Sequence, residues 1–73
     1  MKRDLLSDKI FSIISHSDSP MTVNGIYFAL QNKAVSRNMI ISRLVWLRMA
    51  GLIEKGEMQI ENRKINIYRK KER

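Results

Sequence analysis

The spacing of apolar residues divides the chain into three helical segments followed by two extended ones. Apolar positions at intervals of three and four predict a first helix over residues 4–16, with Asp4 near its start as a cap. The apolar residues of this segment are Leu5, Leu6, Ile10, Ile13 and Ile14. A polar stretch over residues 15–20 predicts a loop. A second helix is expected to begin at the cap Thr22 and to end in a turn over residues 31–34.

The longest helical pattern is the third one, over residues 36–50. Ser36 stands where an N-cap is expected, and Gly51 stands where a helix commonly ends in a left-handed residue. On a helical projection the core face lies within about 60°. Its residues are Ile40, Leu44 and Leu47. Ile53 then begins an extended segment.

The last third of the chain predicts two strands joined by a turn. The first strand, over residues 52–59, has the weaker pattern, and the turn is expected at 61–63. In the second strand, Ile65 and Ile67 alternate with Lys64, Asn66 and Tyr68. This alternation predicts that the two isoleucines share a buried face. The basic residues at 69–73 are expected to form a frayed tail.

The order of helix, helix, helix, strand and strand resembles the winged helix-turn-helix family of DNA-binding domains. Three parts carry the resemblance: Thr22-Val23 with Ile26 and Leu30; Val35-Ser36-Arg37 with Ile40, Leu44, Leu47 and Ala50-Gly51-Leu52-Ile53; and Arg63-Lys64 before the alternating strand. The resemblance implies an α+β winged helix, formed as a single domain over residues 1–73. It also implies a very short first strand near Met21, a recognition helix at about 36–50 and a wing at about 57–64.

The electric charge of the chain is unevenly distributed. The 73 residues carry a formal net charge of +7. Residues 1–32 hold as many basic as acidic side chains, so the whole excess lies in residues 33–73. A basic surface of this kind favours a polyanionic partner, and double-stranded DNA is the expected one. The alternative is a basic, solvated surface without a specific partner.

Composition also excludes several classes of protein. The chain has no cysteine, which favours a reducing compartment, and no apolar run approaches the roughly 20 residues of a membrane span. No export signal is recognisable, so a cytoplasmic location without membrane contact is expected. His16 is the only histidine and lies beside a polar loop. Neither an enzyme, a metal site nor a cofactor is therefore expected.

Reading DNA requires donors that reach base edges and cations that lie near phosphates. Asn38 and Ser42 point away from the core face of the third helix, and Arg37 lies in its first turn, free to reach outward. The predicted DNA-binding residues are Ser36, Arg37, Asn38, Ser42, Arg43, Lys55, Arg63 and Lys64. The alternatives are that Ser36 only caps the helix, and that the cations are solvated.

The outward face of the third helix is more apolar than DNA reading requires. Val45, Trp46 and Met49 lie off its core face. Trp46 either packs within the monomer or belongs to an interface with a second copy or another regulatory protein. The expected function is therefore a sequence-specific DNA-binding regulator. The alternative is a protein-interaction module that binds another regulator or inhibits a host enzyme.

Overall fold

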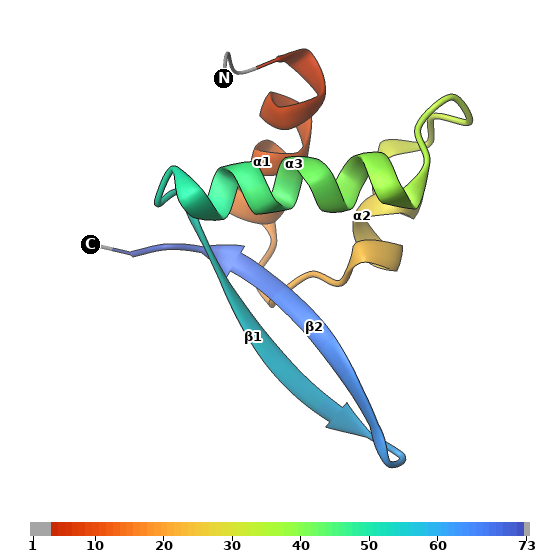
Figure 1. The fold of residues 1–73 in the computed structure, drawn as a ribbon, viewed down its shortest axis with the longest axis vertical. Coiled ribbons are helices and arrows are strands. Elements are labelled where there is room, and N and C mark those ends of the chain that lie inside the picture. The colour runs from red at the N-terminus through yellow and green to blue at the C-terminus, as the bar shows by residue number, and fades with distance from the viewer. Residues whose placement is uncertain (1–3, 73) are drawn as a thin grey trace.

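The computed structural model describes residues 4–72 and contains three helices followed by a β-hairpin (Figure 1). The elements are α1 (Leu5–His16), α2 (Val23–Leu30), α3 (Arg37–Met49), β1 (Ile53–Ile60) and β2 (Arg63–Lys70). This α+β order is the one expected for a winged helix. Each helix lies within a residue or two of its predicted range, and the weaker first strand is present.

All three helices begin at the predicted cap residues. The Asp4 carboxylate accepts a hydrogen bond from the backbone N–H of Ser7 at 2.8 Å. The Thr22 hydroxyl accepts one from Gly25 N–H at 3.0 Å, which begins α2 in the same way. Such bonds satisfy N–H groups that have no partner inside the helix, and each cap contributes about 1 kcal/mol. The caps therefore fix where the helices start.

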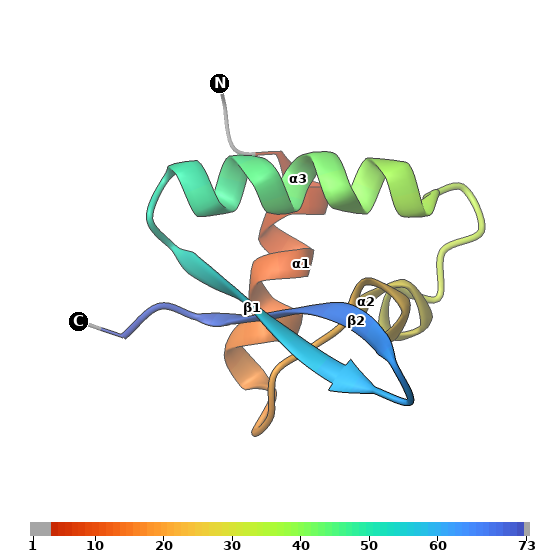
Figure 2. The ribbon, with the colours of Figure 1, turned by 60° about the horizontal axis from the view of Figure 1, so that its bottom comes forward.

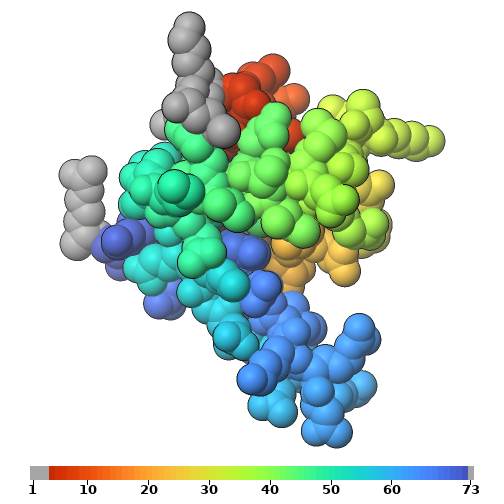
Figure 3. Space-filling model, in the orientation of Figure 1, coloured from red at the N-terminus to blue at the C-terminus, as the bar shows by residue number. Residues whose placement is uncertain are grey.

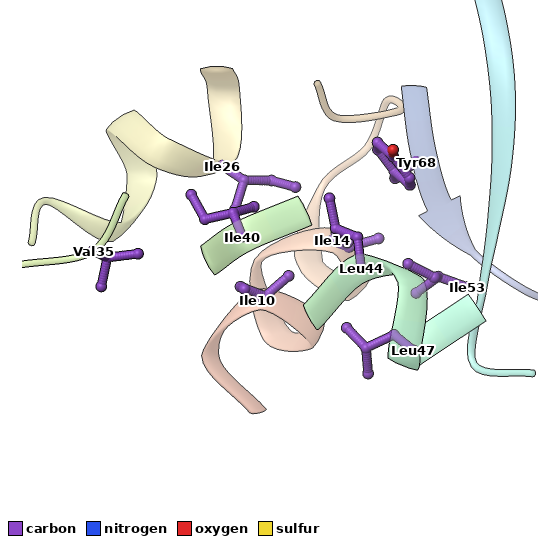
Figure 4. Close-up of a cluster of buried hydrophobic side chains, with 9 residues drawn as sticks. All are labelled: Ile10, Ile14, Ile26, Val35, Ile40, Leu44, Leu47, Ile53 and Tyr68. Atoms are coloured by element: carbon purple, nitrogen blue, oxygen red, sulfur yellow. The ribbon is translucent and has the colours of Figure 1, made fainter. Parts of the chain in front are cut away.

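A single apolar core joins the three helices to the base of the hairpin (Figure 4). Its buried residues are Ile10, Ile14, Ile26, Val35, Ile40, Leu44, Leu47, Ile53 and Tyr68. Three of them are the predicted core residues of α3, which contacts α1, α2 and β1. In Figure 4 these α3 side chains lie between those of the other helices and those of the hairpin. The core thus holds α3 in place while its opposite face stays outside.

The hairpin is antiparallel and closes through a two-residue turn. Glu61 and Asn62 have φ angles of 47° and 65°, so both lie in the left-handed region. Positive φ at both central residues is the requirement of a type I′ turn, whose twist matches that of the strands. The predicted turn over residues 61–63 is one residue too long, since Arg63 is already the first residue of β2. It pairs directly with Ile60.

The short first strand is present as one β-bridge. The backbone N–H of Met21 donates to the Tyr68 carbonyl at 2.8 Å, and Tyr68 N–H donates to the Met21 carbonyl at 2.7 Å. The bridge ties the segment between α1 and α2 to the outer edge of β2. The base of the hairpin is therefore held by apolar contacts with the core and by backbone hydrogen bonds to the segment between α1 and α2.

The predicted buried face of β2 is wrong. Tyr68 is 6% exposed and belongs to the core, whereas Ile65 and Ile67 are only half-buried. Neighbouring residues of a strand point to opposite faces, so the two isoleucines lie on the face away from Tyr68. Ile65 and Ile67 are more covered than Lys64 and Asn66, as the alternation predicts, but neither joins the core. Tyr68 does, because docking of the hairpin base covers the opposite face at that position.

The prediction of a frayed tail from residue 69 is also wrong for its first residues. Arg69 pairs with Glu54 across the hairpin, and their side chains form an ion pair at 3.3 Å. Lys70 pairs with Ile53, and Lys71 N–H donates to the Leu52 carbonyl at 3.1 Å. The two-residue turn places the strands in a register that extends the ladder to Lys70. Arg73 lies outside the described residues.

The hairpin projects beyond the helices that hold its base (Figures 1 and 2). β1 leads away from the end of α3, and β2 leads back toward it. The two strands therefore join the core only at their base, through Ile53 and Tyr68. Exposure rises accordingly, and every residue of β1 from Lys55 onward is exposed. The protruding part has the shape of a wing.

Replacing Tyr68 with Ala tests the reversed strand face. We expect the free energy of unfolding to fall by about 3–5 kcal/mol, the range for loss of a buried aromatic ring. The matched variant Ile65→Ala removes a half-buried side chain from the other face and should cost about 1 kcal/mol. Urea unfolding measures both. A larger loss for Ile65→Ala than for Tyr68→Ala would contradict the assignment of the core face.

Candidate nucleic-acid interface

The outer side of α3 and the wing are exposed on one face of the molecule. Figure 3 views this face: α3 crosses the helical body and the wing projects beside it. The inward side of α3 is fully used by the core, through Ile40, Leu44 and Leu47. Every predicted DNA-binding residue lies on α3, at its cap or on the hairpin. The predicted residues therefore lie on one exposed surface, but they differ in how available their side chains are.

Asn38 is the most available polar side chain of α3. It is exposed and forms no side-chain hydrogen bond to any other residue among residues 4–72. Its amide carries both donors and an acceptor, which is the pattern that pairs with adenine in the major groove. Ser42 lies one turn further along, but its hydroxyl donates to the Met39 carbonyl at 2.8 Å. Among the predicted DNA-binding residues of α3, Asn38 is thus the one that keeps its full hydrogen-bonding capacity.

Arg37 is not free to reach outward, contrary to prediction. Its Nε donates to the Asn24 side-chain oxygen at 2.7 Å, and its guanidinium lies 4.4 Å from the centre of the Tyr27 ring. Both partners belong to α2, so Arg37 fastens the start of α3 to the preceding helix by a hydrogen bond and a cation–π contact. The side chain stays exposed and still adds positive charge to the surface. Helical periodicity gives no sign of this contact.

Arg43 is also engaged within the protein. Its Nε and Nη2 both lie 3.0 Å from the same carboxylate oxygen of Asp4, the cap of α1. Its Nη1 donates to the Ser42 hydroxyl at 3.0 Å. Hydrogen bonds from Ser7 lower the pKa of the Asp4 carboxyl most, and Arg43 lowers it further. Arg43 therefore connects two helices, and only part of its capacity remains for a ligand.

Ser36 has the capping role that was the alternative to DNA binding. Its hydroxyl accepts a hydrogen bond from Met39 N–H at 3.2 Å. The first turn of α3 is thereby closed by a protein group rather than left open for a phosphate. The cap is nevertheless exposed, so neighbouring N–H groups still face solvent.

Three of the predicted cations lie exposed on the hairpin. They are Lys55 on β1, and Arg63 and Lys64 beside the turn. A further exposed cation, Arg48, is not among the predicted residues; it lines a shallow groove between the end of α3 and β1 together with Lys55. Arg48 follows Arg37 by eleven residues, or about three helical turns, and this spacing could have placed both on one side of the helix. The cations thus flank α3 on its wing side.

An apolar ridge runs along the outer side of α3. Ile41, Val45 and Met49 follow one another at intervals of four residues and are 43%, 46% and 82% exposed. Trp46 is half-buried and packs against the core, so its ring is covered to a large extent within the monomer. Of the three apolar residues singled out in the sequence, Val45 and Met49 are the ones left for a partner.

The lone histidine lies apart from the α3 surface. His16 Nδ1 donates to the Ser12 carbonyl at 2.8 Å, at the end of α1 and away from the α3 surface. Among residues 4–72 no three His, Cys, Asp or Glu side chains come together as metal ligands. Within the same range, no helix has both the length and the apolar character that crossing a bilayer requires.

Comparisons with known proteins add no assignment. The chain matches no known protein family and none of the curated proteins. The geometry of α3 and the wing is therefore the basis for any functional inference.

Replacing Asp4 with Asn tests the link between Asp4 and Arg43. A carboxyl whose pKa is lowered by folding stabilises the protein above its ordinary pKa of 3.8, and this contribution is lost as the pH falls through the folded value. Asn caps a helix as well as Asp but carries no charge. We expect Asp4→Asn to be less stable than the parent at neutral pH, with the difference disappearing in acid once the Asp4 carboxyl is protonated.

The measurement is urea unfolding at neutral and at acidic pH. Asp18→Asn is the matched control, because it removes a negative charge from the exposed loop after α1. An equal effect of Asp18→Asn, or a difference between Asp4→Asn and parent that persists in acid, would contradict the link.

Proposed function

We propose that the chain is a winged helix-turn-helix protein that binds double-stranded DNA and acts as a small transcriptional regulator in the cytoplasm. Residues 36–50 would lie in the major groove. The wing, at about 57–64, would lie on the adjacent backbone or in the minor groove. In this proposal Asn38 reads a base edge, and Arg63, Lys64 and Lys55 contact phosphates.

The dimensions of the exposed surface support this proposal. A single helix exposed along its length fits the major groove, which is about 12 Å wide. α3 is supported from behind by the whole core, so its outer residues are presented on a fixed axis. The wing projects from the same face and can reach the phosphates next to that groove (Figure 3). A rigid helix with a projecting hairpin is the geometry that winged helices use.

The distribution of charge supports it independently. The net charge of +7 arises from residues 33–73, which form α3, the hairpin and the turn before them. The α1 side holds balanced charge, so the field is directed outward from the proposed surface. A polyanion gains from releasing counterions where such cations gather.

The single observation that carries the proposal is the placement of Asn38. It lies exposed and unengaged on α3, while the cations around it are held by protein contacts or line the wing. A side chain with two donors and an acceptor, exposed in the first turn of α3, matches direct base readout better than nonspecific attraction.

Salt-dependent binding to duplex DNA tests the electrostatic part. If about five phosphates are contacted, log K should fall with log salt with a slope of roughly −4 to −5. The double variant Arg63→Ala/Lys64→Ala should reduce the magnitude of that slope by about 2. Lys9→Ala, an exposed cation on α1, is the matched control and should change it little. Fluorescence anisotropy measures all three, and absence of binding at low salt would overturn the proposal.

Replacing Asn38 with Ala tests the reading of bases. On a site selected from a random duplex library, affinity should fall by about 1–3 kcal/mol. On random duplex DNA it should stay the same, because phosphate contacts are retained. An equal loss on both kinds of DNA would assign Asn38 to nonspecific contacts, and no loss on either would remove it from the interface.

The apolar ridge favours a second candidate function. Ile41, Val45 and Met49 expose hydrophobic surface where DNA offers mainly polar groups and thymine methyls. The chain would then be a protein-interaction module that binds another regulator or inhibits an enzyme. Met49→Asp would leave the salt slope on random DNA unchanged if the ridge serves a protein partner. Loss of DNA binding in this variant would assign the ridge to the DNA surface.

A further inference from the structure

The outer edge of β1 is open along its whole length. Within residues 4–72, β1 pairs with β2 on one side and with no strand on the other. Its eight residues contain no proline and have one lysine, Lys55. Long exposed edges readily add another strand, and proteins usually blunt them with prolines, bulges or inward charges. β1 has no proline or bulge, and its charged side chains restrict the edge to a second strand of matching charge.

The direction of the free backbone groups follows from the bridge at Tyr68. Tyr68 directs its N–H and carbonyl away from β1, toward Met21. In an antiparallel ladder, two directly opposed residues either form both backbone hydrogen bonds with each other or both direct their N–H and carbonyl groups away from the partner strand. Lys55 is opposite Tyr68, so Lys55 directs its groups to the open side. By alternation, Glu57 and Gln59 do the same.

The side chains of β1 are complementary to a second copy of β1 in one antiparallel register. A two-fold axis at Gly56 places Lys55 of each copy opposite Glu57 of the other, twice. Shifting the axis by one residue in either direction would place Lys55 opposite Lys55, or Glu57 opposite Glu57. Opposed unlike charges stabilise cross-strand pairs, and like charges destabilise them. Charge therefore selects the register centred on Gly56.

We propose that two copies of the chain associate through their β1 edges in this register, forming a four-stranded sheet. The backbone groups that point outward from Lys55 and Glu57 are the ones that would pair. Gly56 lies at the axis, where the absence of a side chain lets the two strands approach without obstruction. This association goes beyond the proposed function and does not depend on it.

The same register brings the tip of one hairpin to the end of α3 in the other copy. Gln59 of the second copy lies opposite Ile53, so its turn continues along the edge toward α3. The shallow groove there is lined by Val45, Arg48 and Met49. Glu61 of the turn carries the charge opposite to that of Arg48. The partner's tip would cover part of the exposed apolar ridge.

Charge reversal at the two facing positions tests the register. Lys55→Glu places two acidic side chains opposite each other in both pairs, and Glu57→Lys places two basic ones there. We expect each single variant to dimerise at least about tenfold more weakly than the parent. The double variant Lys55→Glu/Glu57→Lys restores unlike pairs and should recover parental association. An equimolar mixture of the two single variants should form a mixed dimer more strongly than either variant dimerises alone.

Sedimentation equilibrium from micromolar to millimolar protein measures these states. Circular dichroism checks that the variants fold, which is expected because both positions are exposed. Phe28→Asp, at an exposed position on α2, is the control for association through another face and should leave the dimer unchanged. A parent that stays strictly monomeric would overturn the proposal. So would loss of association in Phe28→Asp, or failure of the double variant and the mixture to restore it.

Discussion

The burial of one face of α3 is the interaction on which the rest of the structure depends. Ile40, Leu44 and Leu47 are at most 1% exposed, and they lie where all three helices and the hairpin meet. A chain of this size buries only about 60% of its unfolded surface, so it has room for one such centre. The exposed residues of α3 and of the hairpin are held in position by this core. The outer side of α3 is presented because the inner side is fixed.

Much of this arrangement follows from local rules that the sequence obeys. The three caps at Asp4, Thr22 and Ser36 and the apolar spacing of the helices determine three elements almost to the residue. The hairpin is less determined, because alternation in a strand defines two faces without saying which is covered. Tyr68 is the covered residue because the bridge to Met21 and the docking of Ile53 fix the base of the wing. Those contacts join segments distant in the chain.

The sequence predicts which elements form the candidate surface, but not which contacts the side chains on that surface make within the protein. Helical spacing and strand alternation predicted the positions of α3 and of the hairpin, and charge pointed to these two elements as the candidate surface. They could not reveal that Arg37 is held by α2 or that Arg43 is held by the cap of α1, since those partners lie 13 and 39 residues away. These two arginines join the helices to one another. Arg37 and Arg43, which the sequence predicts as DNA contacts, thus also stabilise the orientation of α3.

The turn at the tip of the wing has a consequence for the order of folding. Glu61 and Asn62 both occupy the left-handed region, where a residue such as Glu loses roughly 1–2 kcal/mol relative to its preferred conformations. Such a turn is a poor nucleus, unlike Asn-Gly, which favours early local closure. The ladder therefore gains its stability at the other end, where Tyr68 enters the core. These energies favour a wing that closes from base to tip after the helices have met, and that opens from its tip before its base.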